Sequence, residues 1–340
     1  SLNTLAGGGS SLKTNQDSSR GEGSLNTLAG GAPLKANRSP SLGENRGGTT
    51  SSVLATGRWA KIRVAETGVH QLTDDLIRQA GFSDINKVKV YGYGGNLQPE
   101  KLTQDYLQQT DDLQEVEQCV VGGRRLFYAK GPVSWSSNSA TVRTRNPYSD
   151  YGYYFLTEGD PLTVSEQDFL ASCYPQADDY HVLYESDGYA WFQGGRNLYE
   201  TTPINAGSSK TYRLESAATG TTAQLSVTAS AGVTSVVGVS CNGQDLGTIT
   251  INVSPTYYEK GHATNRVFNL SDVLSTNEVT LTTQSGGPVR LDFISLTLAS
   301  PKAAPSLGSD ALPVPEYVYN ITNQNLHGDS AVDMVIIIPT

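Results

Sequence analysis

The sequence predicts a mainly β protein: two β-sandwich or jelly-roll-like domains with one short helix, followed by the first strand of a truncated α/β domain. Three observations support this fold class. Among 340 residues only 17% are charged, and 35 Gly and 18 Tyr accompany many Ser and Thr, which is typical of extended, turn-rich structure. Several short runs repeat their apolar residues with period two. One continuous apolar run stands at the end of the chain.

Composition also limits the classes of function. The chain has 24 Lys and Arg against 33 Asp and Glu, a net charge of −9, and no basic stripe that could bind phosphates, so a nucleic-acid partner is not expected. No run approaches the roughly 18–20 apolar residues that span a bilayer. The single methionine is Met334, so Ser1 is not an initiator, and we expect that a signal peptide or another upstream segment was removed.

Residues 1–52 are predicted to be a low-complexity tail with an internal duplication. The octapeptide SLNTLAGG occupies residues 1–8 and again, unchanged, residues 24–31. The tail lacks aromatic residues and is rich in glycine, so it cannot bury enough apolar surface to offset its ordering entropy. We expect a mobile segment, and a slipped duplication explains the repeat more simply than an interaction motif does.

The predicted first domain, residues 53–171, is a β domain with one helix. Thr73 can cap this helix, Asp74 and Asp75 favour its positive end, and Gly81 can terminate it. Strands are expected at four short runs: residues 61–64, 87–91, 126–129 and 153–156.

The predicted second domain, residues 172–300, is a β-sandwich resembling a jelly roll. Its apolar residues alternate in three runs separated by Gly, Asn and Ser: Leu225/Val227/Ala229, Ile249/Ile251/Val253 and Val279/Leu281. The last strand changes phase, because the alternation that ends at Phe293 starts again at Ile294 on the other face. A β-bulge near these two residues is therefore expected.

Residues 301–331 are predicted to be a linker, which four prolines before residue 316 would stiffen. The run VDMVIIIPT at 332–340 fits a strand buried on both faces. Such a strand needs partners, so we expect it to be the first strand of a third domain whose remainder is absent. The alternative is an edge strand that completes one of the β domains.

The motifs assign no catalytic, cofactor-binding or metal-binding residue. The sequence contains no G-x-S-x-G, no H-E-x-x-H and no phosphate-binding loop. A nucleophile needs an activating base within hydrogen-bond reach. The candidates are Cys119, Cys173, Cys241, His70, His181, His262 and His327. None has a recognisable spacing, so we expect small buried thiols and surface or packed imidazoles.

Two further groups of residues could bind ligands. Adjacent carboxylates at 74–75, 111–112 and 178–179 could hold Ca²⁺ with backbone carbonyls, although solvated turns are the simpler interpretation. Aromatic clusters around Trp191 and Tyr257 could form a sugar-stacking platform, or they could fill the core of the sandwich.

Seven strings, in one order along the chain, resemble a known family. They are WAKIRV at 59–64 with ETGVH at 66–70; VYGYGG at 90–95; LFYAKGP at 126–132; NPYSDYGYYFLT at 146–157; YESD at 184–187; GGRNLYE at 194–200; and NQNLH at 323–327 before DMVI at 333–336. Over residues 53–340 the chain resembles the N-terminal, non-catalytic half of PorU-type peptidases, which are gingipain-like cysteine peptidases of family C25.

The resemblance implies a sortase of the type IX secretion system of Bacteroidetes, which removes the C-terminal sorting signal of secreted cargo. Its caspase-like α/β domain would begin near Asp333, so the Cys-His dyad would lie beyond this chain, and we expect no enzyme activity and no cofactor here. Implied partners are the chain's own C-terminal peptidase domain, outer-membrane secretion components such as a PorV-like barrel, and secreted cargo. The implied location is the extracellular face of the outer membrane, reached through the periplasm. The alternative is a surface-exposed glycan-binding or adhesion module.

Overall fold

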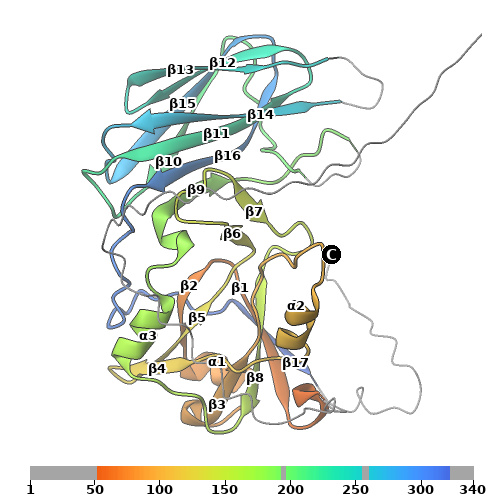
Figure 1. Cartoon of the computed structure of the whole chain (residues 1–340), viewed down its shortest axis with the longest axis vertical. Coiled ribbons are helices and arrows are strands. Elements are labelled where there is room, and N and C mark those ends of the chain that lie inside the picture. Colours follow the sequence, from red (N-terminus) through yellow and green to blue (C-terminus); the bar gives the residue numbers. More distant parts are fainter. Residues whose placement is uncertain (1–51, 193–196, 255–259, 322–340) are drawn as a thin grey trace, which may run out of the picture. The chain divides into compact units, whose positions relative to one another are not determined.

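The computed structural model describes residues 52–192, 197–254 and 260–321, and antiparallel strands dominate them, which confirms the mainly β class (Figure 1). The helices of this part are short: α1 (Asp74–Gln79), α2 (Gln104–Gln109) and α3 (Glu166–Cys173), with 3₁₀ turns η1 (Val53–Ala55), η2 (Ile85–Lys87) and η3 (Ala177–Tyr180). In these residues no helix has the length and apolar character that crossing a bilayer requires.

The first sheet brings together strands from the two ends of the described chain. Its order is β17-β1-β8-β3, and all neighbours are antiparallel: β17 (Tyr317–Ile321), β1 (Trp59–Val64), β8 (Gly152–Glu158) and β3 (Val88–Tyr91). In β1 the alternation places Ala60, Ile62 and Val64 in the core. The strands expected at 61–64, 87–91 and 153–156 are confirmed.

Helix α1 covers the core of this sheet and has the expected ends. The backbone N–H of Leu76 donates to the Thr73 hydroxyl at 3.2 Å, and Leu76 and Ile77 are buried. Gly81, just beyond the helix, has a φ of +79°, a conformation that glycine adopts without strain. Helices α2 and α3 were not expected from the sequence.

A three-stranded sheet with the order β2-β5-β4 holds a second small core: β2 (Gly68–Leu72), β5 (Arg124–Ala129) and β4 (Gln118–Val121). Helix α3 packs there, because Phe169 and Cys173 lie in one buried cluster with Cys119 and Leu126. The strand expected at 126–129 lies within β5. A hairpin of β6 (Val133–Trp135) and β7 (Arg143–Arg145) follows.

Two four-stranded sheets enclose the largest core and form the expected sandwich. Their orders are β10-β15-β12-β13 and β14-β11-β16-β9. The strands are β9 (His181–Glu185), β10 (Ser209–Glu215), β11 (Ala223–Ala231), β12 (Ser235–Cys241), β13 (Gln244–Ile251), β14 (His262–Leu270), β15 (Thr276–Ser285) and β16 (Val289–Leu298). The alternating residues of the sequence, Leu225, Ile249 and Leu281 among them, are buried between the sheets.

The bulge expected near Phe293 and Ile294 is confirmed, and the bulged residue is Asp292. Thr228 of β11 pairs with Phe293, whereas its neighbour Ala229 pairs with Leu291, so Asp292 has no partner in β11. The extra residue shifts the alternation by one, so that Leu291 before it and Ile294, Leu296 and Leu298 after it all lie in the core of the sandwich. Asp292 itself is outside the regular pairing.

Residues 301–316, which we name the strap, were predicted to be part of a linker, but they are packed. Leu307 is buried in the cluster of Phe169. The backbone N–H of Gln71 donates to the carbonyl of Pro313 at 2.9 Å, and that of Glu316 donates to the carbonyl of Arg63 at 3.1 Å. The chain then enters β17. The strap is thus held in place along the first domain, and the domain boundaries themselves stay predictions.

Several expectations fall outside the described residues. They concern the duplicated tail up to residue 51, the aromatic pair at 257–258, His327 and the apolar run at 332–340.

Candidate functional site

Two arginines of the short strand β7 point to the sandwich. Arg143 and Arg145 are separated by Thr144, so strand alternation places both guanidiniums on one side of β7. Both side chains are largely buried.

Three carboxylates face these arginines. Glu185 ends β9 and pairs with Phe293 of β16, so the bulge places Asp292 beside it. Asp187 lies just beyond the end of β9. Carboxylate oxygens of Glu185, Asp187 and Asp292 lie within 4.8 Å of one another. We call these three carboxylates and the two arginines the ion-pair cluster.

Each arginine forms ion pairs with a different subset of the carboxylates. Arg143 pairs with Glu185 and lies 3.8 Å from Asp292. Arg145 lies 3.0 Å from Asp187 through Nε and 3.4 Å from Glu185 through Nη1. Outside the cluster, Arg145 also pairs with Asp150 at 2.6 Å. Glu185, only 6% exposed, therefore has two cationic partners, whereas Asp292 has one distant partner.

Burial dominates the electrostatics of the cluster. It raises the pKa of Asp292 to about 6, an effect that Arg143 opposes and Asp187 reinforces. Burial raises the pKa of Asp187 as well, against the attraction of both arginines. It lowers the pKa of Arg143.

A divalent cation could use these three carboxylates as ligands, since hard cations prefer oxygen. Arg143 and Arg145 already lie among them and supply positive charge. The two guanidiniums thus offset two of the three carboxylate charges, and Asp292 has the weakest partner of the three.

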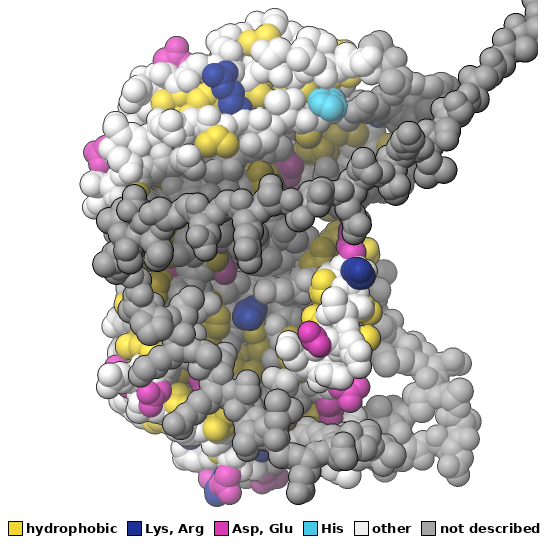
Figure 2. Space-filling model, in the orientation of Figure 1, with side chains coloured by type: hydrophobic (Ala, Val, Ile, Leu, Met, Phe, Trp, Pro, Cys, Tyr) yellow, Lys and Arg dark blue, Asp and Glu magenta, His cyan; other side chains and the backbone are white. Residues whose placement is uncertain are grey.

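A pocket of about 680 Å³ opens beside the cluster. Its wall is formed by residues from the segments 94–100 and 143–150, by the three carboxylates and by Asn197 and Leu198. On the face of the molecule in Figure 2, Lys and Arg side chains lie apart from one another, among acidic and uncharged ones.

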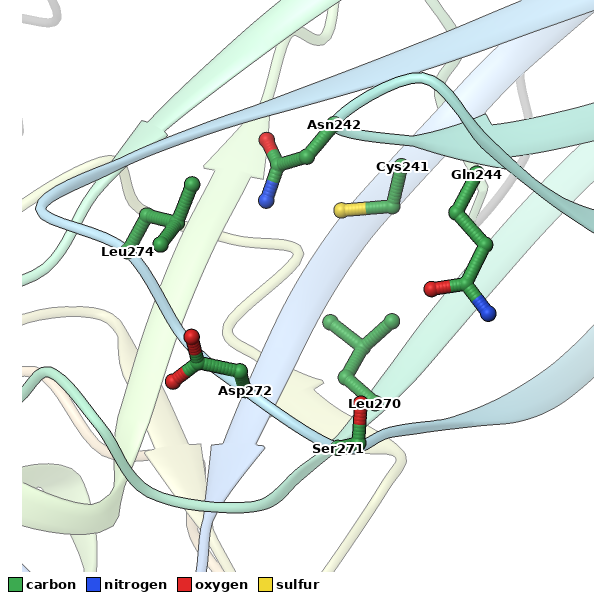
Figure 3. Close-up of a pocket in the computed structure, with 7 residues that line it drawn as sticks. All are labelled: Cys241, Asn242, Gln244, Leu270, Ser271, Asp272 and Leu274. Atoms are coloured by element: carbon green, nitrogen blue, oxygen red, sulfur yellow. The ribbon is translucent and has the colours of Figure 1, made fainter.

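A smaller pocket of about 150 Å³ lies at one end of the sandwich, between the β12–β13 turn and the segment after β14 (Figure 3). Cys241 and Asp272 are among its lining residues. Burial raises the pKa of the Cys241 thiol, and no histidine of the described residues lines this pocket, so nothing in its wall activates the thiol as a nucleophile.

The cysteines and two of the histidines are packed in the interior, as expected. Cys119, Cys173 and Cys241 are buried and free, and burial raises the pKa of Cys173 to about 11. His70 and His181 are both buried. His181 stacks on Trp135 with ring centroids 3.7 Å apart, and burial lowers its pKa to about 4. The fold brings no cysteine of this part of the chain to a histidine as a catalytic pair.

The adjacent carboxylate pairs do not gather into one site. Asp74 and Asp75 are exposed in the first turn of α1. Asp112 accepts hydrogen bonds from the hydroxyl of Ser52 at 2.8 Å and the N–H of Val53 at 2.6 Å. Asp178 has a raised pKa because of burial, near Lys302.

Trp191 is half-buried and anchored in the sandwich. Its indole N–H donates to the hydroxyl of Ser230 at 2.9 Å, and Tyr189 meets it edge to face at 5.5 Å. Phe192, next in the chain, is 66% exposed.

The residues of the ion-pair cluster were not identified from the sequence. Two signals were present: the YESD string contains Glu185 and Asp187, and the phase change in β16 marks the position of Asp292. Neither signal indicated that β7 would supply the arginines.

Together these features define the class of protein: a mainly β chain with a two-sheet sandwich and smaller antiparallel sheets. The ion-pair cluster joins the β6–β7 hairpin to the sandwich. Comparison with solved structures gives a particular relative. The chain is similar to the dimeric latent PorU from Porphyromonas gingivalis, with 29% identity and a TM-score of 0.56 over 73% of this chain. The match covers 25% of that protein, so the matched part of this chain corresponds to about a quarter of it. The resemblance to PorU in the sequence is confirmed.

Weaker likenesses concern carbohydrate-binding modules. The GH26-CBM35 mannanase of Podospora anserina matches with 19% identity and a TM-score of 0.27, over 37% of this chain and 29% of that one. A CBM6 module of the Cellvibrio mixtus lichenase 5A matches with 17% identity and a TM-score of 0.22, over 28% of this chain and 72% of that module. At these TM-scores they indicate nothing about ligands of this chain. No family model and no curated protein matches the sequence.

Proposed function

We propose that this chain is the non-catalytic N-terminal region of a cell-surface cysteine peptidase of the PorU type, and that it supports the peptidase domain. The observation that carries the proposal is the likeness to PorU over 73% of the chain at 29% identity. In this proposal the whole protein removes C-terminal sorting signals from secreted cargo at the extracellular face of the outer membrane. A PorV-like barrel is its proposed partner there.

The fold offers a physical basis for a supporting role. The strap and β17 return the chain to the first sheet, where β17 pairs with β1 over five residues. Residue 321 is therefore held at the edge of the first sheet by backbone pairing, and in this proposal the edge strand is the point from which the chain leads to the peptidase domain.

The test is carried out in cells that express the parent gene. Deletion of the codons for residues 53–321, with the downstream peptidase region retained, is expected to abolish cargo processing, which mass spectrometry of cargo C-termini measures. Normal processing by the deleted protein would contradict the supporting role.

A biochemical test concerns catalysis by the chain itself. The 340-residue chain is expected to cleave no peptide in a fluorogenic library. Turnover that disappears when Cys119, Cys173 and Cys241 are all replaced by Ser would overturn the non-catalytic assignment.

A second candidate function is glycan binding by the sandwich. The observation in its favour is the aromatic group at Tyr189, Trp191 and Phe192, where an exposed ring adjoins an anchored indole. A glycan array with the chain and its Trp191→Ala and Phe192→Ala variants tests this function. Binding that both variants lose would favour the glycan module over the support of a peptidase.

A further inference from the structure

The described residues that line the pocket beside the ion-pair cluster carry more acidic than basic side chains. Two guanidiniums and five carboxylates line it: Arg143, Arg145, Glu100, Asp150, Glu185, Asp187 and Asp292. A concave site with this balance favours a cationic ligand over a neutral or anionic one.

Among the residues that the structure describes, the carboxylates of the wall differ in how well they are paired. Glu185 and Asp187 have close guanidinium partners, but the nearest charged nitrogen of this part of the chain to Asp292 is Nη2 of Arg143 at 3.8 Å, beyond hydrogen-bond distance. Among the residues that the structure describes, none donates a hydrogen bond to this carboxylate. Asp292 lines the pocket and can accept a hydrogen bond from a ligand there.

Three large, exposed side chains also line the same pocket. Leu97, Tyr148 and Leu198 line it, and all three are exposed; Tyr148 is 83% exposed. Large exposed apolar side chains that gather at one pocket indicate a ligand with an apolar portion. Because they line the same pocket as Asp292, the ligand should combine an aliphatic stem with a positive charge.

We propose that this pocket binds a lysine side chain presented by an extended peptide, with the ammonium group at Asp292 and the aliphatic stem against Leu97, Leu198 and Tyr148. The volume of about 680 Å³ exceeds one side chain and leaves room for the peptide backbone. We expect an ammonium to be preferred over a guanidinium, because Glu185 and Asp187 are already paired with arginines and Asp292 alone offers a point acceptor and not a carboxylate pair for a planar fork. The proposal does not depend on the proposed peptidase function.

The test measures the binding of two matched peptides to the whole 340-residue chain by calorimetry. The probes are acetyl-Gly-Lys-Gly-amide and acetyl-Gly-norleucine-Gly-amide, which share the aliphatic stem and differ in the charge. The lysine peptide is expected to bind about tenfold tighter, as for one charge-assisted hydrogen bond. Asp292→Asn is expected to remove this difference.

Two further variants complete the design. Asp310→Asn makes the same chemical change on the strap, outside the pocket, and is expected to leave both affinities unchanged. Tyr148→Ala changes a side chain too exposed to affect folding, and is expected to weaken both peptides. The proposal is overturned if neither peptide binds, if both bind equally, if an arginine peptide binds as well as the lysine peptide, or if Asp292→Asn keeps the preference for lysine.

Discussion

Asp292 is a charged residue that the bulge of β16 holds in a largely buried position. Its pKa in the folded chain is about 6, above the ordinary value of 3.8, because burial outweighs the attraction of Arg143. The folded state therefore binds this proton more tightly than the unfolded state does. The ionised form costs stability above pH 6, and the cost disappears as the pH falls toward 4.

Asp292→Asn is accordingly expected to stabilise the chain at pH 8 by about 1–3 kcal/mol, because a tenfold change in proton affinity corresponds to about 1.4 kcal/mol. At pH 4.5 the gain should be small. Urea unfolding of the parent chain and the variant at the two pH values gives the difference in unfolding free energy between them. His181, whose pKa is lowered, contributes with the opposite pH dependence to both proteins, so its contribution cancels in this difference. A variant that is less stable at pH 8 would show that the attraction of Arg143 outweighs burial.

Gly261 is a second position where a single added atom is expected to change stability. A Cβ atom there would overlap with the ring of Trp191, which is held by Ser230. Gly261→Ala is expected to destabilise the sandwich by about 1–3 kcal/mol and to shift the fluorescence of Trp191. Gly308→Ala is the control, because a Cβ at Gly308 meets no atom within 4 Å. Equal stabilities for the two variants would contradict the close packing of Trp191.

At the scale of elements, the strap shows how tertiary contacts overrode a linker-like composition. At Lys302 the backbone N–H donates to the carbonyl of Asp179, and the carbonyl accepts from the Tyr174 hydroxyl, both at 2.7 Å. Trypsin is therefore expected to cut after the exposed Lys101 well before it cuts after Lys302. Timed digestion with mass spectrometry measures the order, and earlier cleavage after Lys302 would indicate a free linker.

The elements that were predicted differ from those that were not in the strength of their local signals. Helix α1 has a cap, acidic residues in its first turn and a terminal glycine, so local chemistry specified it. Helix α3 also has a cap, at Ser165, but only Phe169 and Cys173 are buried on it. Its apolar pattern was too short to distinguish it from a loop before the packing was known.

At the scale of the whole molecule, the pair of Arg143 and Glu185 joins the β6–β7 hairpin to the sandwich. Arg143→Ala leaves Glu185 with Arg145 alone, and Glu185→Ala leaves Arg143 with the distant Asp292, so each single variant is expected to cost about 2–3 kcal/mol. The double variant should lose about 1–3 kcal/mol less than the sum of the single variants. Chemical unfolding of the four proteins gives this coupling energy.

The exposed pair Arg78 and Asp75 on α1 is the matched control. Its coupling energy is expected to be about 0.5 kcal/mol or less, because water screens both charges. A similarly small coupling for Arg143 and Glu185 would mean that this pair does not hold the hairpin to the sandwich.

Local patterns were enough to predict the mainly β class, the strands around Ile62, Val90 and Leu225, the cap of α1 and the bulge in β16, because each depends on residues close together in the chain. The resemblance to PorU was also visible in the amino-acid strings. The packing of the strap, and the cluster of Arg143, Glu185 and Asp292, became visible only in the folded chain. These residues come from strands far apart in the chain, and the pairing of β9 with β16 brings the carboxylates together. No local pattern encodes such proximity, and the burial that results sets the charge and the binding properties of the cluster.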